Sequence, residues 1–381
     1  MNGLYICFEF DINNEKNTSN GIGKKIYNQV DTFKKYGYKM TFINPYIENN
    51  INQSSLFNRI LRRFPFYGHF IKLKINPNNV LQADFIYIRK NWFIDYDLIH
   101  LLLIIKRINP NLKILMEIPT YPYDHEIMKK SMYPLLIKDK IFRCKLKKYV
   151  DRIVTYSNDK WIFGIKTINI NNAISVDDEI ITKKKVNNQK IIECIAVSNL
   201  GFWHGYDRVI EGLHNYISNG GTRKIIFHVV GEGLELKKLK ELTKKYSLSD
   251  YVFFHGKLFG EELNKLYSSS QIGFDSLGRH RSKVYYNSSL KSKEYLCKGV
   301  LIVSSVNSEL DKDNTFDYIL KIKSDDSPVD FNEIIKFYDS KLGNKNLNNI
   351  LEEMINYAKN NFDFYKSFKP IIEYLENVKC I

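Results

Sequence analysis

Hydrophobic residues recur along the chain in two alternating patterns: short apolar runs, and longer stretches with apolar positions every three or four residues. The apolar runs of the first half fall at Leu4–Phe8, Tyr38–Ile43, Ala83–Arg89, Lys113–Ile118 and Asp151–Tyr156. Between them, Ile26–Phe33 and Asp95–Ile108 keep helical spacing. Regular alternation of strand and helix predicts a parallel α/β sheet of the Rossmann-like kind.

The second half repeats this alternation. Its strands are expected at Ile191–Val197, Lys224–Val230, Tyr251–His255 and on both sides of the helix that contains Glu294. The stretch Asn171–Gln189, with three consecutive lysines, is expected to cross between the domains. The pattern therefore predicts an α/β protein with doubly wound parallel sheets in domains 1–180 and 181–360, followed by a terminal helix at 361–381.

The segment Leu56–Ile75 interrupts the alternation because it mixes basic and apolar residues and contains no acidic one. Arg59, Arg62 and Arg63 stand among large hydrophobic side chains, which is typical of a segment lying on an anionic membrane. A solvated helix that turns its apolar side to the core would show the same composition. A second basic stretch, Glu126–Tyr149, is expected to be a long helix with a solvated face.

The net charge of +15 over 381 residues indicates an anionic partner, such as nucleic acid, a membrane surface or a phosphorylated substrate. Five scattered cysteines without a CxxC pair favour neither disulfides nor a zinc site. The apolar run Leu98–Ile105 is too short to span a bilayer, and the amino terminus runs straight into a strand. We therefore expect a cytoplasmic protein, peripheral on the inner face of the membrane if its basic segments bind lipid.

The stretch Gln271–Ser304 carries the clearest candidate chemistry. A basic loop with Arg279, His280, Arg281 and Lys283 joins a buried strand to a helix that begins near Ser289. The free N–H groups of a helix start suit a phosphate, and Glu294 on the second turn suits ribose hydroxyls. Gly21 and Gly23 lack the rest of the dinucleotide pattern and do not favour NAD.

A second candidate site follows the strand Lys113–Ile118. Two prolines make the segment from Glu117 to His125 a rigid loop, and open α/β sheets bind ligands at such strand ends. Tyr121, Tyr123, Asp124 and His125 gather in this loop.

The order of these pieces resembles the retaining glycosyltransferases of family 4, also called glycosyl transferases group 1, which include bacterial polysaccharide enzymes. The segments that carry the resemblance are collinear over nearly the whole chain: GIGKKIYNQV, DRIVTYSNDK, NNAISVDD, GFWHGYDRVIEGL, VVGEGLELKKL and KSKEYLCKGVLIVSS. The resemblance implies the GT-B architecture of two facing Rossmann-like domains. It also implies that the last helix, with Phe364, returns to the first domain.

The resemblance also implies roles for particular residues. Glu294 corresponds to the glutamate that holds the donor ribose, whereas Tyr286 stands where the family has its first motif glutamate. Asn199 and His204 replace the family's phosphate-binding Arg/Lys pair, and we expect Arg281 and Lys291 to supply the missing charge. The remaining implied donor-binding residues are Gly21, Gly23, Glu232, Gly233, Lys257, Leu258, Ser289 and Leu290. Asp124 and His125 are the candidate catalytic residues on the acceptor side, with Glu117 behind them.

The expected function is transfer of a hexose-type sugar from a nucleotide-diphosphate sugar, with UDP as the expected nucleotide, to a lipid-linked glycan acceptor. The expected setting is synthesis of cell-surface polysaccharide or glycoconjugate. No cofactor or metal is expected, and nucleic acid is not an expected partner because no reading helix or RNA-binding aromatic pattern is recognisable. The alternative is a non-catalytic GT-B partner protein, which the residues at 199, 204 and 286 would explain.

Overall fold

The computed structural model describes residues 1–8, 21–50, 56–61, 63–64, 67, 74–90, 93–127, 129–175, 190–342 and 347–377. The chain forms two compact units. Unit 1 comprises Met1–Asn171 and Phe364–Ile381, and unit 2 comprises Asn172–Asp363. The domain boundaries predicted from the sequence lay after residues 180 and 360. In the structure the first boundary falls earlier, after Asn171, and the second falls later, after Asp363.

Unit 1 is built on a seven-stranded sheet in the order β2-β1-β3-β4-β5-β7-β6. All neighbouring strands are parallel except β6 and β7, which form a hairpin. The strands are β1 (Asn2–Cys7), β2 (Lys39–Ile43), β3 (Phe85–Arg89), β4 (Lys113–Ile118), β5 (Arg152–Thr155), β6 (Trp161–Ile162) and β7 (Ile165–Asn169). The central strands β3 and β4 are almost wholly buried, as expected when helices cover both faces.

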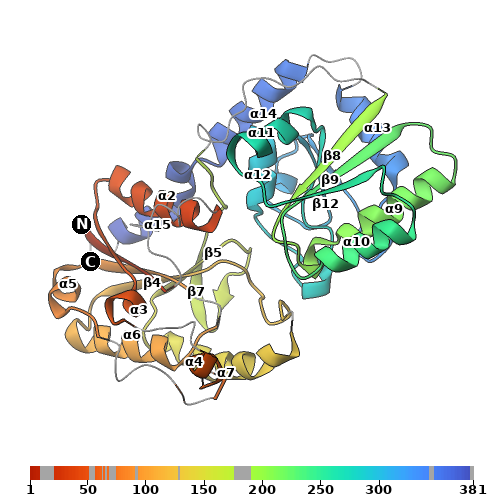
Figure 1. Ribbon diagram of the computed structural model, residues 1–381. Coiled ribbons are helices and arrows are strands. Elements are labelled where there is room, and N and C mark those ends of the chain that lie inside the picture. The colour runs from red at the N-terminus through yellow and green to blue at the C-terminus, as the bar shows by residue number, and fades with distance from the viewer. Residues whose placement is uncertain are drawn as a thin grey trace. The chain divides into compact units, whose positions relative to one another are not determined.

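Helices cover the two faces of this sheet in Figure 1, with α2 and α15 on one side and α5, α6 and α7 on the other. Their bounds are α2 (Gly21–Lys35), α3 (Pro45–Glu48), α4 (Leu56–Leu61), α5 (Pro77–Gln82), α6 (Tyr96–Ile108), α7 (Tyr133–Arg143) and α15 (Phe364–Asn377). Helix α6 begins where the Asp95 side chain accepts a hydrogen bond from the Leu98 N–H. Its apolar face, which includes Leu101, Leu102 and Ile105, packs in the core.

The terminal helix α15 packs on α2. The Phe368 ring contacts Phe33 edge to face at 5.3 Å, and Tyr365 stacks on Tyr36 at 3.9 Å. The Tyr36 hydroxyl also donates to the Tyr365 carbonyl. The end of the chain therefore belongs to the core of unit 1.

Unit 2 contains a six-stranded parallel sheet in the order β10-β9-β8-β11-β12-β13. The strands are β8 (Ile191–Val197), β9 (Lys224–Val230), β10 (Val252–Gly256), β11 (Ile272–Phe274), β12 (Leu301–Ser304) and β13 (Ile319–Lys321). From β8 the chain first builds outward to β9 and β10, and then returns to add β11 on the other side of β8. Open sheets of this kind bind ligands beyond the carboxyl ends of the strands where the order reverses, here β8 and β11.

The helices of unit 2 form a layer on each face of the sheet (Figure 1). They are α9 (Tyr206–Ser218), α10 (Leu236–Lys245), α11 (Gly260–Ser269), α12 (Leu290–Cys297), α13 (Phe331–Leu342) and α14 (Leu347–Asn361). Helix α12 ends at Cys297, and two residues later Gly299 has a φ of 58°, the left-handed conformation that glycine adopts readily. The two doubly wound parallel sheets confirm the predicted fold class.

Two local predictions were wrong in detail. The helix predicted at Glu126–Tyr149 is shorter, because a proline inside a helix clashes with the carbonyl four residues before it. Helix α7 therefore begins at Tyr133, directly before Pro134, and short 3₁₀ turns flank it. The helix predicted from Ile26 begins earlier, since Gly21 and Gly23 form the first turn of α2.

Candidate functional site

The candidate site of unit 2 lies in two loops that follow β8 and β11. Backbone hydrogen bonds join these loops, from Leu277 N to the His204 carbonyl at 2.8 Å and from Gly278 N to the Trp203 carbonyl at 3.1 Å. Gly205 has φ of 66°, and a Cβ there would stand 2.7 Å from the Gly278 nitrogen. The close approach of the loops therefore requires glycine at 205.

His204 is buried where the first loop enters α9. Its Nδ1 accepts a hydrogen bond from Gly201 N at 3.1 Å, and its ring stacks on Tyr206. Burial, followed by the charges of Lys291 and Arg279, lowers the pKa of His204 well below the usual value. The imidazole is therefore neutral, with its proton on Nε2 available to donate to an anion.

The start of α12 forms the opposite side of the site. Ser289 occupies the N-cap position, but its hydroxyl donates to Asp275 at 2.7 Å and makes no capping bond to the helix. The first-turn N–H groups therefore have no side-chain cap, which leaves the positive end of the helix to a ligand. Leu290 is the first residue of this helix.

Lys291 brings an amine to the same place, on a side chain that is 14% exposed. Its Nζ lies 3.0 Å from the Ser276 hydroxyl and 3.5 Å from Asp275. Burial lowers the pKa of Lys291 to about 8, although Asp275 opposes the shift. The amine is thus charged at neutral pH and attracts an anion strongly, because burial reduces solvent screening.

Arg279 supplies a second cation that the sequence analysis did not select. Its guanidinium lies 5.8 Å from the centre of the Trp203 ring, and its charge lowers the pKa of both His204 and Lys291. Arg279 therefore lies close enough to His204 and Lys291 for its charge to act on both. The sequence feature that could have identified Arg279 is its position in the basic loop directly after β11. His280, Arg281 and Lys283 share that loop, so the feature does not single out Arg279.

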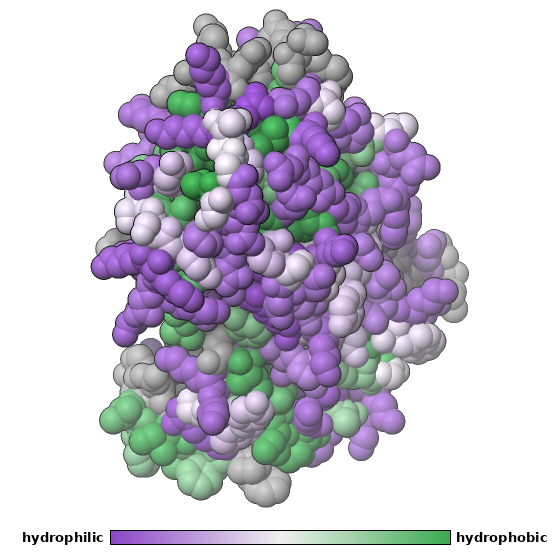
Figure 2. Space-filling model, turned by 90° about the vertical axis from the view of Figure 1, so that its right-hand side faces the viewer, coloured by the Kyte–Doolittle hydropathy of each residue, from purple (hydrophilic) through white to green (hydrophobic). Residues whose placement is uncertain are grey.

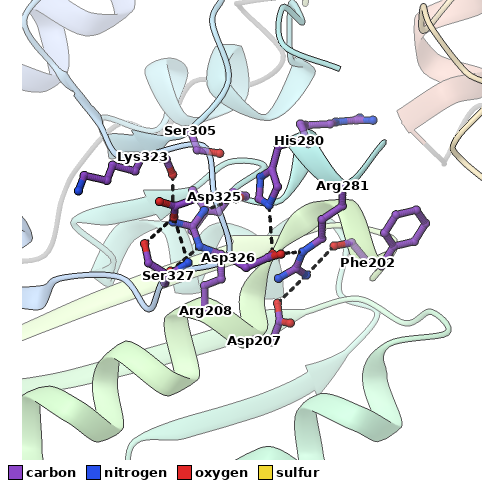
Figure 3. Close-up of polar contacts among 12 residues, drawn as sticks. Phe202, Asp207, Arg208, His280, Arg281, Ser305, Lys323, Asp325, Asp326 and Ser327 are labelled. Carbon is purple, nitrogen blue, oxygen red and sulfur yellow. Dashed lines mark hydrogen bonds and ion pairs between the residues drawn. The ribbon is translucent and has the colours of Figure 1, made fainter. Parts of the chain in front are cut away.

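Arg281, which the sequence analysis did select, is held by carboxylates (Figure 3). Its guanidinium donates to Asp207 at 3.0 Å, Asp326 at 2.7 Å and the Phe202 carbonyl at 3.0 Å. Burial alone would raise the pKa of Asp207, but Arg281 outweighs burial and holds it below its usual value. Arg281 therefore ties the two loops together, and much of its charge is already compensated.

Arg208, on α9, holds the loop that follows β11. Its side chain is buried in unit 2 and donates to three backbone carbonyls, those of Leu277, Lys323 and Ser327. Figure 3 shows Arg208 and Arg281 in one network with Asp325 and Asp326 from the loop that follows β13. This network fixes the backbone from which Arg279 projects.

The two turns that the resemblance assigns to donor binding follow β9 and β10. Gly233 approaches the Leu200 backbone so closely that a Cβ would lie 2.3 Å from its carbonyl oxygen. Glu232 pairs with Lys257 across the two turns at 3.3 Å, and Leu258 follows Lys257. The structure thus brings Glu232, Gly233, Lys257 and Leu258 together at one end of the sheet.

The other predicted donor residues of unit 2 differ in their surroundings. Glu294 lies on α12, within electrostatic reach of Lys291, and Asn199 is exposed on the loop after β8. Tyr286 pairs with Asn307 through the backbone, and the Lys312 amine lies 5.2 Å from its ring. Asp275 and Ser276, which the sequence analysis did not select, lie closest to Lys291.

The predicted catalytic residues Asp124 and His125 lie in the loop after β4 of unit 1. Asp124 accepts two hydrogen bonds from Arg143, at 2.6 and 3.1 Å, so its charge is compensated. His125 is exposed beside it. Gly21 and Gly23 also belong to unit 1, at the start of α2.

Glu117 lies below this loop in a buried cluster of charges. It pairs with Arg89 and with Lys25, whose Nζ is 3.6 Å away, and accepts from Gln29 and Tyr87. Burial would raise the pKa of Glu117, but Arg89 and Lys25 outweigh burial and hold it below its usual value. Burial lowers the pKa of Lys25 to about 7, despite attraction to Glu117.

Within unit 1, Arg63 follows α4, while the side chain of Arg59 and the whole of Arg62 lie outside the described residues. In the part of the chain that the structure describes, none of the helices is both long enough and apolar enough to cross a bilayer. Over the same residues, no three histidine, cysteine or acidic side chains are grouped as a metal site would require.

Comparisons with solved structures match both units together. A glycosyltransferase from Rickettsia africae ESF-5 is 14% identical over 99% of this chain and 98% of its own, with a TM-score of 0.62. Sucrose-phosphate synthase from Thermosynechococcus elongatus is 12% identical over 100% and 99%, with a TM-score of 0.63. The Anabaena protein HepE, in complex with UDP-glucose, is 12% identical over 99% and 100%, also at 0.63. No curated protein matches the sequence.

The comparison with family models agrees with the matches to solved glycosyltransferase structures. Residues 177–274, which contain β8, the His204 loop and the glycine turns, match the family described as glycosyl transferases group 1. The chain thus has the GT-B glycosyltransferase fold, and residues 177–274 of its second unit carry the sequence pattern of glycosyl transferases group 1.

Proposed function

We propose that the protein is a retaining glycosyltransferase that moves a hexose-type sugar from a UDP-sugar to a lipid-linked glycan acceptor. The observation that carries this proposal is the set of anion-binding groups at the ends of β8 and β11. Lys291, Arg279, His204 Nε2 and the uncapped start of α12 converge there. The complexes of HepE with UDP and UDP-glucose support UDP as the nucleotide.

The chemical task of the site is to stabilise a leaving diphosphate. In a retaining transfer the bond from the anomeric carbon to the diphosphate oxygen breaks, the acceptor hydroxyl oxygen bonds to that carbon from the same face, and the hydroxyl proton passes to the departing diphosphate. Negative charge grows on the departing oxygen, where buried cations and helix N–H groups stabilise it most. Lys291 and Arg279 supply this charge in the proposal, so no metal is required.

The other predicted residues complete the proposal. Glu294 accepts from the donor ribose, and the turns at Glu232–Gly233 and Lys257–Leu258 meet the nucleoside. Asp124 and His125 of unit 1 act on the acceptor side in the proposal, and Gly21 and Gly23 at the start of α2 bind the donor. We place the reaction in cell-surface polysaccharide or glycoconjugate synthesis at the cytoplasmic face of the membrane, contacted through the Arg59, Arg62 and Arg63 segment.

The competing function is a non-catalytic partner that keeps the fold. The observation that favours it is Tyr286, which stands where the resemblance places a glutamate and whose ring contacts the Lys312 amine. Such a protein would bind UDP without turning over a UDP-sugar.

The test is release of UDP from a panel of UDP-sugars with lipid-linked acceptors. We expect turnover, a product that keeps the anomeric configuration of the donor, and loss of activity in Glu294→Ala. Glu241→Ala, on the exposed face of α10, is the matched control and should be unaffected. UDP binding without turnover of any donor would favour the non-catalytic function.

A further inference from the structure

Helix α4 and the turn after it carry large apolar side chains that face solvent. Leu56, Phe57, Ile60 and Phe64 are 72%, 67%, 48% and 58% exposed. Exposed side chains of this size, gathered in one place, indicate an interaction surface. Figure 2 shows hydrophobic side chains gathered at the lower end of the molecule, the end of unit 1 that holds α4 and α7 in Figure 1.

Helix α7 continues this surface. Tyr133, Ile137 and Ile141 recur every fourth residue on its outer side and are 41–55% exposed. Its inner side buries Leu136 and Phe142. Because residues four apart share one helix face, α7 presents an apolar stripe outward in addition to the one that holds it to the core.

One chain of hydrogen bonds connects the two segments. The Phe64 carbonyl accepts from Tyr67 N at 3.3 Å, and the Tyr67 carbonyl accepts from the Lys138 amine of α7. The two segments are therefore neighbours in unit 1, and we call their exposed apolar groups together the α4–α7 surface.

The charge around this surface is positive. Lys129 and Lys130 are exposed directly before α7, and Lys145, Lys147 and Lys148 are exposed after it. Asp139 is the only acidic residue in the sequence from Lys129 to Lys148, and it is buried against Tyr123 and the Ile94 N–H. The surface therefore complements an anionic partner.

We propose that the α4–α7 surface lies on an anionic lipid bilayer, with its apolar side chains in the boundary between headgroups and acyl chains. Apolar stripes bordered by lysine are the composition of helices that lie in this boundary. A protein partner is less well matched, because lysine is depleted at protein interfaces. This inference deepens the membrane contact of the proposed function by adding α7, and it is independent of catalysis.

The test is sedimentation of the full chain with vesicles of phosphatidylcholine, with and without phosphatidylglycerol. We expect binding that requires phosphatidylglycerol and weakens at high salt. Phe57→Ser and Ile137→Ser should each weaken vesicle binding about tenfold, because each removes a large apolar group that the bilayer would cover. Leu81→Ser, equally apolar and 60% exposed on α5, is the matched control and should bind as the parent does.

Two results would overturn the proposal. One is equal binding by the parent, Phe57→Ser, Ile137→Ser and Leu81→Ser, or no binding to anionic vesicles. The other is a concentration-dependent oligomer that the two surface substitutions abolish without any effect on vesicles, which would assign the surface to a protein partner. UDP binding by each variant, measured separately, shows that it is folded and keeps failure of this inference distinct from failure of the glycosyltransferase assignment.

Discussion

Lys291 carries a charge on which the proposed phosphate site depends, and burial makes that charge sensitive to pH. Its pKa of about 8 lies below the ordinary 10.5 because a buried ammonium loses solvation. The neutral amine is thus favoured by folding, so Lys291 contributes stability that increases as pH rises from about 8 towards 10.5. Anion binding has the opposite pH dependence, because it needs the charged form.

We therefore expect the affinity for UDP to fall as pH rises through about 8. Lys291→Arg should keep a constant affinity over the same range, because a guanidinium remains charged. Calorimetric titration with UDP at a series of pH values measures both proteins. A matching decline in Lys291→Arg would assign the pH dependence to another group.

Which arginine of the basic loop is held by carboxylates could not be predicted from the sequence. Arg279 and Arg281 are two residues apart in one basic loop, and composition does not distinguish them. The 3₁₀ turn Arg279–Ser282 directs Arg281 to Asp207 and Asp326, from two other segments of unit 2. Their positions near Arg281 depend on tertiary contacts that a motif does not contain.

At the scale of elements, the carboxyl ends of β3 and β4 hold the buried cluster of Glu117, Arg89 and Lys25. Two cations and one carboxylate are removed from water there, together with Gln29 and Tyr87. Removing one member of a buried ion cluster leaves the others uncompensated, which costs more than the net stability the intact cluster provides.

Glu117→Gln should therefore destabilise the protein by about 3–5 kcal/mol. Urea denaturation compares it with Glu241→Gln, whose carboxylate on α10 makes an exposed pair with Lys237 and should change stability by about 0.5 kcal/mol or less. Equal effects of the two substitutions would mean that the Glu117 cluster is not the compensated ion group described here.

Apolar periodicity was sufficient to predict most strands and helices and the doubly wound class. Strands such as Lys113–Ile118 and Ile191–Val197 have the predicted bounds, because buried parallel strands are continuous apolar runs. The long helix predicted at Glu126–Tyr149 was wrong, because Pro134 fits only the first turn of a helix and α7 begins beside it. The hydrogen bond from the Ser289 hydroxyl to Asp275, which closes the connection between β11 and α12, was not predicted, because the two residues are far apart along that connection.

At the scale of the whole molecule, each of the two units contains one candidate site at the ends of its own strands. The side chains of the proposed phosphate site belong to unit 2, since His204, Arg279 and Lys291 all lie between Asn172 and Asp363. The acceptor-side candidates and the α4–α7 surface belong to unit 1. Nucleotide binding is therefore the property that tests unit 2 by itself.

The most direct test is calorimetric titration of UDP into the parent protein, Arg279→Gln and Arg223→Gln. Arg223 precedes β9, at the opposite end of the strands, and its loss removes the same charge from unit 2. We predict that the parent binds UDP, that Arg279→Gln binds about tenfold or more weakly, and that Arg223→Gln binds as the parent does. Absence of UDP binding by the parent, or unchanged affinity in Arg279→Gln, would contradict the assignment of the phosphate site.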